Sequence, residues 1–224
     1  MTRPLRHGQP WGQAAAGPPD LEVTGDDADL AGAAARHPDA LVRFRPSPQS
    51  DIARALGLSP DGTGTTEVAL DALALRGMSE GEAMTAVNAL VVGSPPDRLR
   101  GTARSVPITV IVDGRTWYEG PATTIVVASG QFLRGADLVP RGHPGDGWAE
   151  VQVYALTPRD RRAMRHRLAT GTHVPHPSIH TTRARAVEVE VTGKPLRVEV
   201  DGHDRARARL LRVTLVPGAI RILV

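Results

Sequence analysis

The sequence predicts a mixed fold, α/β plus all-β, in which a small parallel α/β layer precedes a mostly antiparallel β domain filling the C-terminal two-thirds of the chain. Near the N-terminus, two short apolar runs alternate with two helical segments, which is typical of a parallel α/β layer. From about Ala83 onward, apolar residues recur at every second position, as they do in half-buried strands. Asp113-Gly114 and Asp201-Gly202 end two of these runs, and Asp-Gly favours tight hairpins because both central residues of a type I′ turn have positive φ.

The composition excludes several classes of site. The 224 residues include no cysteine, which excludes disulfides, thiolate catalysis and cysteine-ligated metals. Hydrophobic residues make up 41% and aromatic residues only 3%, so the core must consist mainly of Val, Leu, Ile and Ala. No apolar run approaches the roughly 18 residues that span a bilayer, and residues 1–17 contain no apolar segment of a secretory signal. We therefore expect a cytoplasmic protein.

The charge of the chain is positive and comes almost entirely from arginine. The formal net charge is +3, and Lys194 is the single lysine. This bias has a simple interpretation, the codon usage of a GC-rich genome, and a functional one, affinity for anionic partners. The net charge is too small to favour nucleic acid, so no nucleic-acid partner is expected. The sequence does not determine the oligomeric state, and it is compatible with a homo-oligomer.

The predicted first domain covers residues 21–82 and follows a leader, residues 1–20, that is rich in Gly, Pro, Gln and Ala and is expected to be disordered. Strands are predicted over 21–24 and 40–44. Helices are predicted around residues 30–35 and over 51–56, where Gly57 ends the second helix as a C-cap. Residues 59–66 have the composition of a loop, and the apolar run 68–75 fits a helix or a strand.

The predicted second domain covers residues 83–224. Strands are expected over 106–112, 123–128, 148–155, 186–191, 196–200, 210–216 and 219–224, with Pro217-Gly218 forming a type II turn between the last two. One helix interrupts them: Thr157 is its N-cap, Pro158 occupies its first position and Gly171 closes it. Five arginines lie on its predicted polar faces: Arg159, Arg161, Arg162, Arg165 and Arg167.

Three motifs in this order resemble one family. They are Ser50-Asp51-Ile52-Ala53-Arg54-Ala55-Leu56, the stretch from Val127-Ala128-Ser129-Gly130 to Gly145-Asp146-Gly147, and Val198-Glu199-Val200-Asp201-Gly202 with the later Pro217-Gly218. They are similar to motifs of the bacterial diacylglycerol kinase and lipid kinase family, which shares its fold with the NAD kinases. The resemblance covers most of residues 21–224 and is more specific in the C-terminal half. It implies a reduced parallel α/β nucleotide-binding layer packed on an antiparallel β-sandwich-like domain.

The resemblance implies two nucleotide-binding loops, and both are altered here. Thr24-Gly25-Asp26-Asp27-Ala28 keeps only the central Gly-Asp of the family's Gly-Gly-Asp-Gly-Thr, and Asp27 adds bulk and negative charge where a glycine would let the backbone approach phosphate. Ser47-Pro48-Gln49-Ser50-Asp51 keeps only the last Asp of the second loop. The implied nucleotide-binding residues are Gly25, Asp26, Ser47, Ser50 and Asp51. The family's opening strand has no counterpart, so the nucleotide-binding half is expected to be truncated.

The resemblance also implies a metal ligand and a base, which phosphoryl transfer requires. Asp146 matches the family's acidic metal residue, which would hold Mg²⁺. His203 stands where the family has a glutamate base, and an imidazole with an ordinary pKa near 6.5 can also accept a proton. The simpler interpretation is that Asp201-Gly202 is only a hairpin turn and His203 an exposed strand residue.

Two functions remain as hypotheses. The first is ATP-dependent transfer of phosphate to a diacylglycerol-like lipid, with ATP and Mg²⁺ as cofactors implied by the resemblance. The second is a catalytically inactive relative that binds nucleotide, anionic lipid or a protein partner, which the altered loops favour. The basic helix over 158–169 has two interpretations: a solvated face of the β domain, which its narrow apolar stripe favours, or a surface for anionic membranes, which a lipid kinase would need and which would make the protein peripheral to the membrane. A NAD kinase-like activity would need an intact Gly-Gly-Asp-Gly-Thr loop and is disfavoured.

Overall fold

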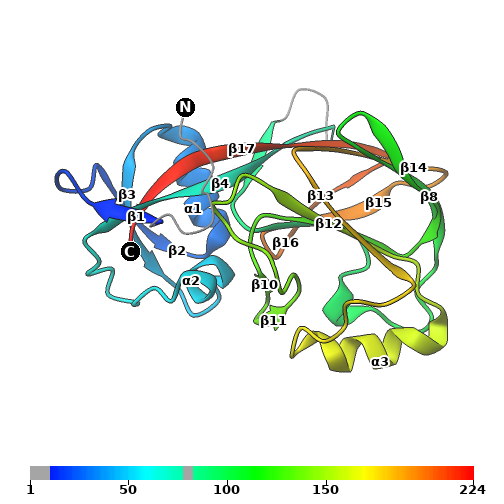
Figure 1. Ribbon diagram of the computed structural model, residues 1–224. Coiled ribbons are helices and arrows are strands. Elements are labelled where there is room, and N and C mark those ends of the chain that lie inside the picture. The colour runs from blue at the N-terminus through cyan, green and yellow to red at the C-terminus, as the bar shows by residue number, and fades with distance from the viewer. Residues whose placement is uncertain (1–10, 78–82) are drawn as a thin grey trace.

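The computed structural model describes residues 11–77 and 83–224, which form two lobes joined by two long strands (Figure 1). The first lobe contains β1 (Gly12–Ala14), β2 (Leu21–Gly25), α1 (Asp27–Arg36), β3 (Leu41–Pro46), α2 (Asp51–Leu56) and the first part of β4 (Thr66–Arg76). Strands β2 and β3 are parallel, as predicted, and β3 is also parallel to the end of β17 (Leu210–Leu223). The last strand of the chain therefore completes the sheet of the first lobe.

The second lobe is a sandwich of strands with few helices. Its strands are β5 (Met84–Ala86), β6 (Ala89–Gly93), β7 (Val106–Val112), β8 (Arg115–Ala122), β9 (Thr124–Ala128), β12 (Ala149–Tyr154), β13 (Ile179–Ala184), β14 (Ala186–Val191), β15 (Leu196–Val200) and β16 (His203–Ala208). The remaining elements are the 3-10 helix η1 (Pro96–Arg98), the hairpin of β10 (Phe132–Leu133) and β11 (Ala136–Asp137), and helix α3 (Pro158–Leu168).

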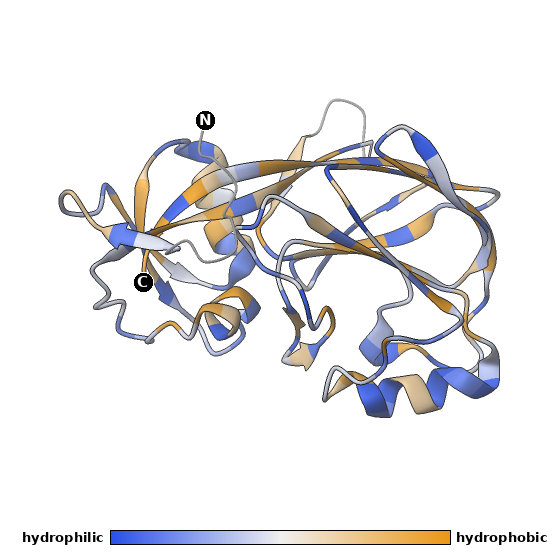
Figure 2. Cartoon of the chain, in the orientation of Figure 1, coloured by the Kyte–Doolittle hydropathy of each residue, from blue (hydrophilic) through white to orange (hydrophobic). Residues whose placement is uncertain are grey.

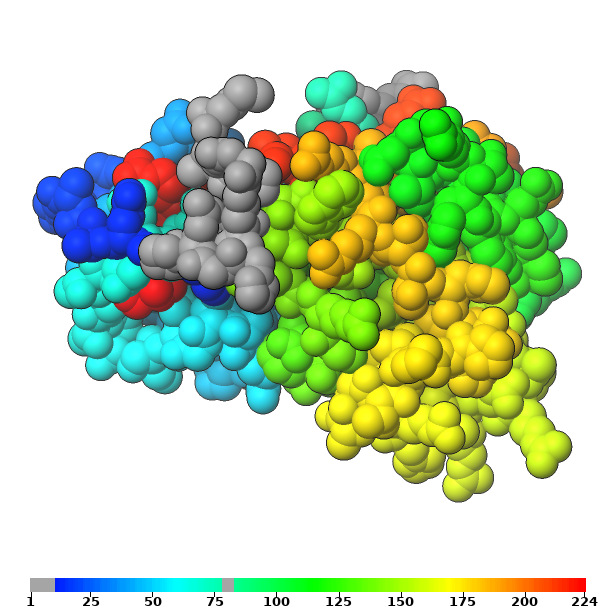
Figure 3. Space-filling model, viewed as in Figure 1, coloured from blue at the N-terminus to red at the C-terminus, as the bar shows by residue number. Residues whose placement is uncertain are grey.

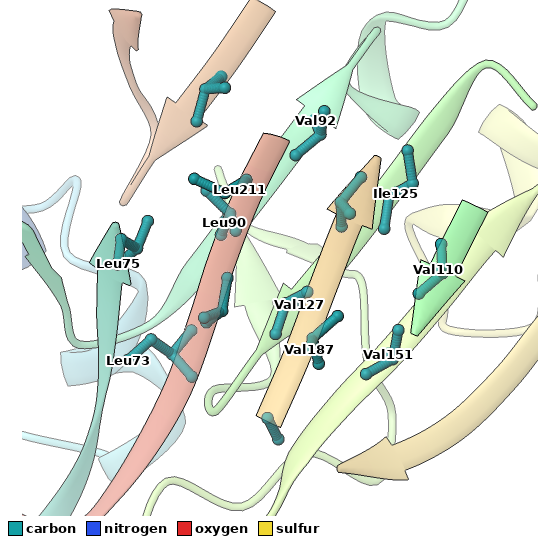
Figure 4. Packing of buried hydrophobic residues seen from close by; sticks show 14 of the residues in the cluster. Leu73, Leu75, Leu90, Val92, Val110, Ile125, Val127, Val151, Val187 and Leu211 are labelled. Carbon is teal, nitrogen blue, oxygen red and sulfur yellow. The ribbon is translucent and has the colours of Figure 1, made fainter. Parts of the chain in front are cut away.

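Two sheets make up the sandwich. A nine-stranded sheet follows the order β1-β4-β17-β14-β7-β8, with β2, β3 and β5 attached, and a six-stranded antiparallel sheet follows the order β13-β12-β9-β6-β15-β16. Between them lies a core of aliphatic residues from both sheets, including Leu73, Val110 and Val187 from the first and Leu90, Val127 and Val151 from the second (Figure 4). The predicted fold class is confirmed.

The central strands of the six-stranded sheet are buried on both faces, whereas its edge strands β13 and β16 are largely exposed. Its second face carries Val126 and Tyr154, which pack with Met164 and Leu168 of α3. Because neither face meets water, every residue of β9 is buried and the strand is a continuous apolar run rather than an alternating one. The outer surface of α3 is strongly hydrophilic (Figure 2). Among the described residues, no helix has the length and apolar character needed to cross a membrane.

Two predictions about domain organisation are wrong. Gly12–Ala14 lies in the predicted disordered leader but forms β1, which pairs with the start of β4; residues 1–10 of that leader lie outside the described residues. The lobes do not separate at residues 82–83, because β4 and β17 run through both of them. Leu70 packs in the core of the first lobe, whereas Leu73, three residues later, packs in the sandwich core.

One prediction about the last strands is also wrong, and the extent of one strand was not predicted. Pro217-Gly218 is not a turn between strands: β17 is continuous, and its register with β4 shifts between Val216 and Ile220. Such a bulge bends a strand, which suits the passage of β17 from one lobe to the other. Strand β16 was not predicted, because its polar residues alternate with small alanines and it lies at a sheet edge, where little apolar surface is needed.

Arg161 is buried, unlike the other four arginines of α3, which are exposed. It was predicted on a polar face, but it is 2% exposed, and its guanidinium donates to the carbonyls of Leu156, Gly101 and Ala103 and to Ser105 Oγ. This side chain therefore ties the helix to the loop after η1.

Candidate functional site

The candidate site lies where the two lobes meet and is assembled from four segments. They are the N-terminal ends of α1 and α2, the backbone at 87–89, and the turn between β15 and β16. Hydrogen bonds between residues far apart in the sequence join these segments. The structure brings five of the predicted site residues into this region: Gly25, Asp26, Ser50, Asp51 and His203.

Asp26 links α1 to His203. It is the N-cap of α1, and its Oδ1 accepts from the backbone N–H groups of Ala28 at 2.9 Å and Asp29 at 3.2 Å. Its Oδ2 lies 2.7 Å from Nε2 of His203, whose side chain is 48% exposed. Partial burial raises the pKa of the Asp26 carboxyl, but the hydrogen bond from His203 and the bonds from the α1 backbone hold it below its ordinary value. Asp26 and His203 therefore form a hydrogen-bonded pair at the entrance to the site.

Gly25 and Ser47 support this geometry through their backbone. Gly25 has a φ of 144°, and a Cβ at this position would lie 1.9 Å from the Asp29 carboxylate, which completes the cap of α1 by accepting from the Asp26 N–H. The Ser47 N–H donates to the Gly25 carbonyl at 2.7 Å. Glycine is thus required at position 25 for the helix cap, since no side chain fits there.

Asp27 is buried, and although it belongs to α1, its carboxylate caps the N-terminal end of α2. Its carboxylate accepts from Ser50 Oγ at 2.6 Å and from the N–H groups of Asp51 and Ile52 at 3.2 Å each. Ser50 Oγ in turn accepts from the N–H of Ala53 and caps α2. Burial, and next the nearby charge of Asp201, raise the pKa of Asp27 to about 7. A carboxylate of the chain itself therefore occupies the N-terminal end of α2, where backbone N–H groups favour an anion.

Asp51 binds the hairpin of the second lobe. Its carboxylate accepts from the N–H of Gly135 at 2.8 Å and also from the N–H of Arg134. Burial raises the pKa of Asp51, although these N–H groups and nearby arginines oppose the increase. The α2 region and the β10–β11 region accordingly abut on the surface of the molecule (Figure 3).

Asp201 was predicted only as a turn residue, yet its carboxylate accepts hydrogen bonds from three consecutive backbone N–H groups. It has a φ of 47° and is 6% exposed. Its two oxygens accept from the N–H groups of Val87, Asn88 and Ala89 at 2.9 to 3.0 Å. Burial raises its pKa to about 6, against the effect of these three bonds. Sequence patterns could not indicate this role, because its partners lie more than 110 positions away.

Asp146, the predicted metal ligand, belongs to a different set of contacts. Its Oδ1 accepts from the Trp148 N–H at 3.0 Å, and its Oδ2 lies 3.7 Å from Arg183. The next residue, Gly147, donates to buried Asp71 at 2.7 Å. Within residues 11–77 and 83–224, no three acidic or histidine side chains gather closely enough to hold a metal ion.

The raised pKa values of Asp27 and Asp201 predict an unusual dependence of stability on pH. The folded state holds their protons more tightly than the unfolded state, where the ordinary value is 3.8, so the stability contributed by protonation is present at low pH and is lost as pH rises through about 6 to 7. We compare the free energy of unfolding of Asp27→Asn with that of wild type at pH 5 and at pH 7.5. We expect the difference to shift in favour of the variant by on the order of 2 kcal/mol at the higher pH.

Urea denaturation of both proteins at the two pH values measures this difference. Asp204→Asn, at an exposed aspartate of β16, is the control and should parallel wild type. A constant difference between Asp27→Asn and wild type across this pH range would show that Asp27 keeps an ordinary pKa.

Comparison with solved structures shows the fold. A diacylglycerol kinase from Bacillus anthracis str. Sterne aligns at 18% identity with a TM-score of 0.68, over 91% of this chain and 76% of its own. Two further structures from that organism align at 16% identity with TM-scores of 0.72 and 0.73. The yeast NADH kinase complexed with NADH aligns at 11% identity with a TM-score of 0.50, over 91% of this chain and 61% of its own.

Comparison with models of protein families shows which family the chain belongs to. No curated protein matches the chain. The model of the YegS C-terminal NAD kinase beta sandwich-like domain matches residues 99–224, more than half of the chain. This match supports the predicted resemblance, and the chain belongs to the family of the YegS C-terminal NAD kinase beta sandwich-like domain.

Proposed function

We propose that this chain is a non-catalytic member of the lipid kinase family that binds anionic lipid at its surface. The observation that supports the loss of catalysis most directly is the bonding of Asp27. Its carboxylate accepts hydrogen bonds from the Ser50 hydroxyl and from two backbone N–H groups of α2, and a nucleotide phosphate would need these same donors. A phosphate would have to displace a buried carboxylate that is already satisfied.

The charge of the site supports the same conclusion. The charge of Asp201 raises the pKa of Asp27, and the charge of Asp26 raises the pKa of Asp201, so a nucleotide polyphosphate would meet the repulsion of these carboxylates. A divalent cation would offset this repulsion, but Asp146 contacts Trp148 and Arg183, and its acidic neighbours are Asp71 and Glu150 rather than Asp26, Asp27 or Asp201. The residues present therefore do not fit Mg-ATP.

Helix α3 is the surface that supports lipid binding. Met164 and Leu168 pack inward, whereas Arg159, Arg162 and Arg165 are exposed. Each arginine close to an anionic membrane surface contributes about 1 kcal/mol of binding free energy. We expect the double substitution Arg162→Ala with Arg165→Ala to weaken partitioning onto phosphatidylglycerol vesicles by about 30-fold.

Co-sedimentation with vesicles containing phosphatidylglycerol measures this partitioning. The matched control removes the same charge elsewhere, by Arg115→Ala with Arg209→Ala, and should change partitioning less than threefold. An equal loss in both double variants would contradict a role for α3. In a parallel assay with labelled ATP and diacylglycerol, the wild-type protein should produce no more phosphorylated lipid than Asp26→Ala does.

A second candidate, phosphoryl transfer to a lipid hydroxyl, has one specific observation in its favour. Because Nε2 of His203 faces Asp26 at 2.7 Å, the carboxylate would orient the ring and leave Nδ1 to accept a proton from an acceptor hydroxyl. This arrangement suits a general base. Labelled lipid formed by wild type and lost in His203→Ala would favour this candidate over the non-catalytic one.

A further inference from the structure

We infer that an arginine-lined pocket at the end of the sandwich binds a phosphate-bearing ligand. The pocket has a volume of about 380 Å³ and lies between the end of β6, the loop at residues 98–104 and the β15–β16 pair. Five arginines line it, and no acidic residue does: Arg98, Arg100, Arg104, Arg197 and Arg207. A volume of this size falls within the range of small-ligand sites.

Three of these arginines are unpaired. Arg98 lies near Asp97, and Arg197 contacts Glu199 at 3.2 Å and Asp204 at 2.7 Å. For Arg100, Arg104 and Arg207, all exposed, no carboxylate among the described residues lies within ion-pair distance. The pocket therefore holds positive charge that no carboxylate in the described part of the chain neutralises.

The strand register adds an independent reason to expect an anion. Arg197 of β15 and Arg207 of β16 are direct cross-strand partners. Like charges in directly opposed positions destabilise a strand pair. A phosphate placed between the two guanidinium groups would convert this repulsion into two favourable contacts, and the guanidinium fork matches phosphate oxygens in pairs.

The loop that carries Arg100 and Arg104 is held in place from inside. The buried guanidinium of Arg161 donates to the carbonyl of Gly101 at 2.8 Å and to that of Ala103 at 2.6 Å. These bonds order the backbone between the two arginines before any ligand arrives, so less conformational entropy is lost on binding.

This pocket is distinct from the site between the lobes. Ala89 at the start of β6 accepts from the Asp201 N–H, whereas Gly93 at the end of the same strand lines the pocket. Four residues of extended strand separate the two by about 13 Å. The inference therefore does not rest on the proposed loss of catalysis, and it holds for an active or an inactive kinase relative.

Calorimetric titration of the full chain with inorganic pyrophosphate tests the pocket. We expect saturable binding to wild type, weakened at least about tenfold in Arg207→Ala and in Arg104→Ala, because each removes one charge-assisted contact. Arg115→Ala, which removes the same charge from the β7–β8 hairpin, should change affinity less than twofold. Thermal melting of each variant separates loss of binding from loss of folding, and the two pocket variants test the site independently.

Competition distinguishes the sources of the phosphate. Vesicles carrying phosphatidic acid should displace pyrophosphate if the ligand is a lipid headgroup, and phosphatidylglycerol vesicles of equal charge should displace it less. Failure of both vesicles to compete would assign the pocket to a free phosphate compound. Absence of pyrophosphate binding to wild type, or equal weakening in Arg115→Ala and Arg207→Ala, would overturn the inference.

Discussion

We expect Asp201→Ala to lower the free energy of unfolding by about 3–5 kcal/mol. The substitution leaves the buried N–H groups of Val87, Asn88 and Ala89 without their acceptors, and each unsatisfied donor costs about 1–3 kcal/mol. Alanine also fits poorly at this position, because the φ of 47° favours Gly, Asn or Asp. The turn at 201–202 would thus lose both its anchor and its preferred conformation.

Chemical denaturation of wild type and variant measures this loss. Asp204→Ala is the matched control, because Asp204 lies in the adjoining strand with its side chain 60% exposed and makes only a surface ion pair with Arg197. Its removal should cost less than about 1 kcal/mol. Similar losses in the two variants would mean that the Asp201 hydrogen bonds contribute little to the stability of the fold.

The second large effect concerns Arg161, for which we expect Arg161→Ala to cost about 3 kcal/mol. Its guanidinium satisfies three backbone carbonyls and one hydroxyl, all of which would lose a donor. Burial lowers the pKa of Arg161, which reflects the cost of placing a cation there, and its hydrogen bonds offset that cost.

Arg162, the next residue of α3, provides the control. It is exposed, so Arg162→Ala removes the same side chain and charge at nearly unchanged stability, within about 0.5 kcal/mol. Thermal and urea denaturation of the two variants would settle the difference. If Arg162→Ala were as destabilising as Arg161→Ala, the loss of any arginine side chain from α3, rather than of the buried hydrogen bonds, would explain the effect.

Elements with strong local patterns could be predicted from the sequence. Helix α2 with its C-cap Gly57, helix α3 with its N-cap Thr157, and the hairpin at Asp113-Gly114 lie where capping and turn residues placed them. The bulge at Pro217-Gly218 could not be distinguished from a turn, because both use the same residues. Strand β16 escaped prediction because it is an edge strand with few large apolar residues.

The candidate site was predictable only as a set of residues, not as an arrangement. Motif resemblance predicted Asp26, Ser50 and His203 as site residues. In the structure, Asp26 contacts His203, and Ser50 donates to the neighbouring Asp27. The partners that define their roles are backbone N–H groups at large sequence separation, which residue identity does not encode. From the sequence, Asp27 was interpreted as an obstacle to phosphate binding and Asp201 as a turn residue. In the structure, each is a buried acceptor of backbone hydrogen bonds.

The proposed loss of catalysis depends most on carboxylates of the chain itself, which occupy the places between the lobes where nucleotide phosphates would bind. Calorimetric titration of the full chain with Mg-ATP tests this claim, with Asp27→Gly as the variant that removes the competing carboxylate. We predict no saturable heat for wild type at millimolar nucleotide, and a gain of binding in Asp27→Gly if it remains folded. Saturable binding of Mg-ATP to wild type that is lost in Asp26→Ala would contradict the account and support an active lipid kinase.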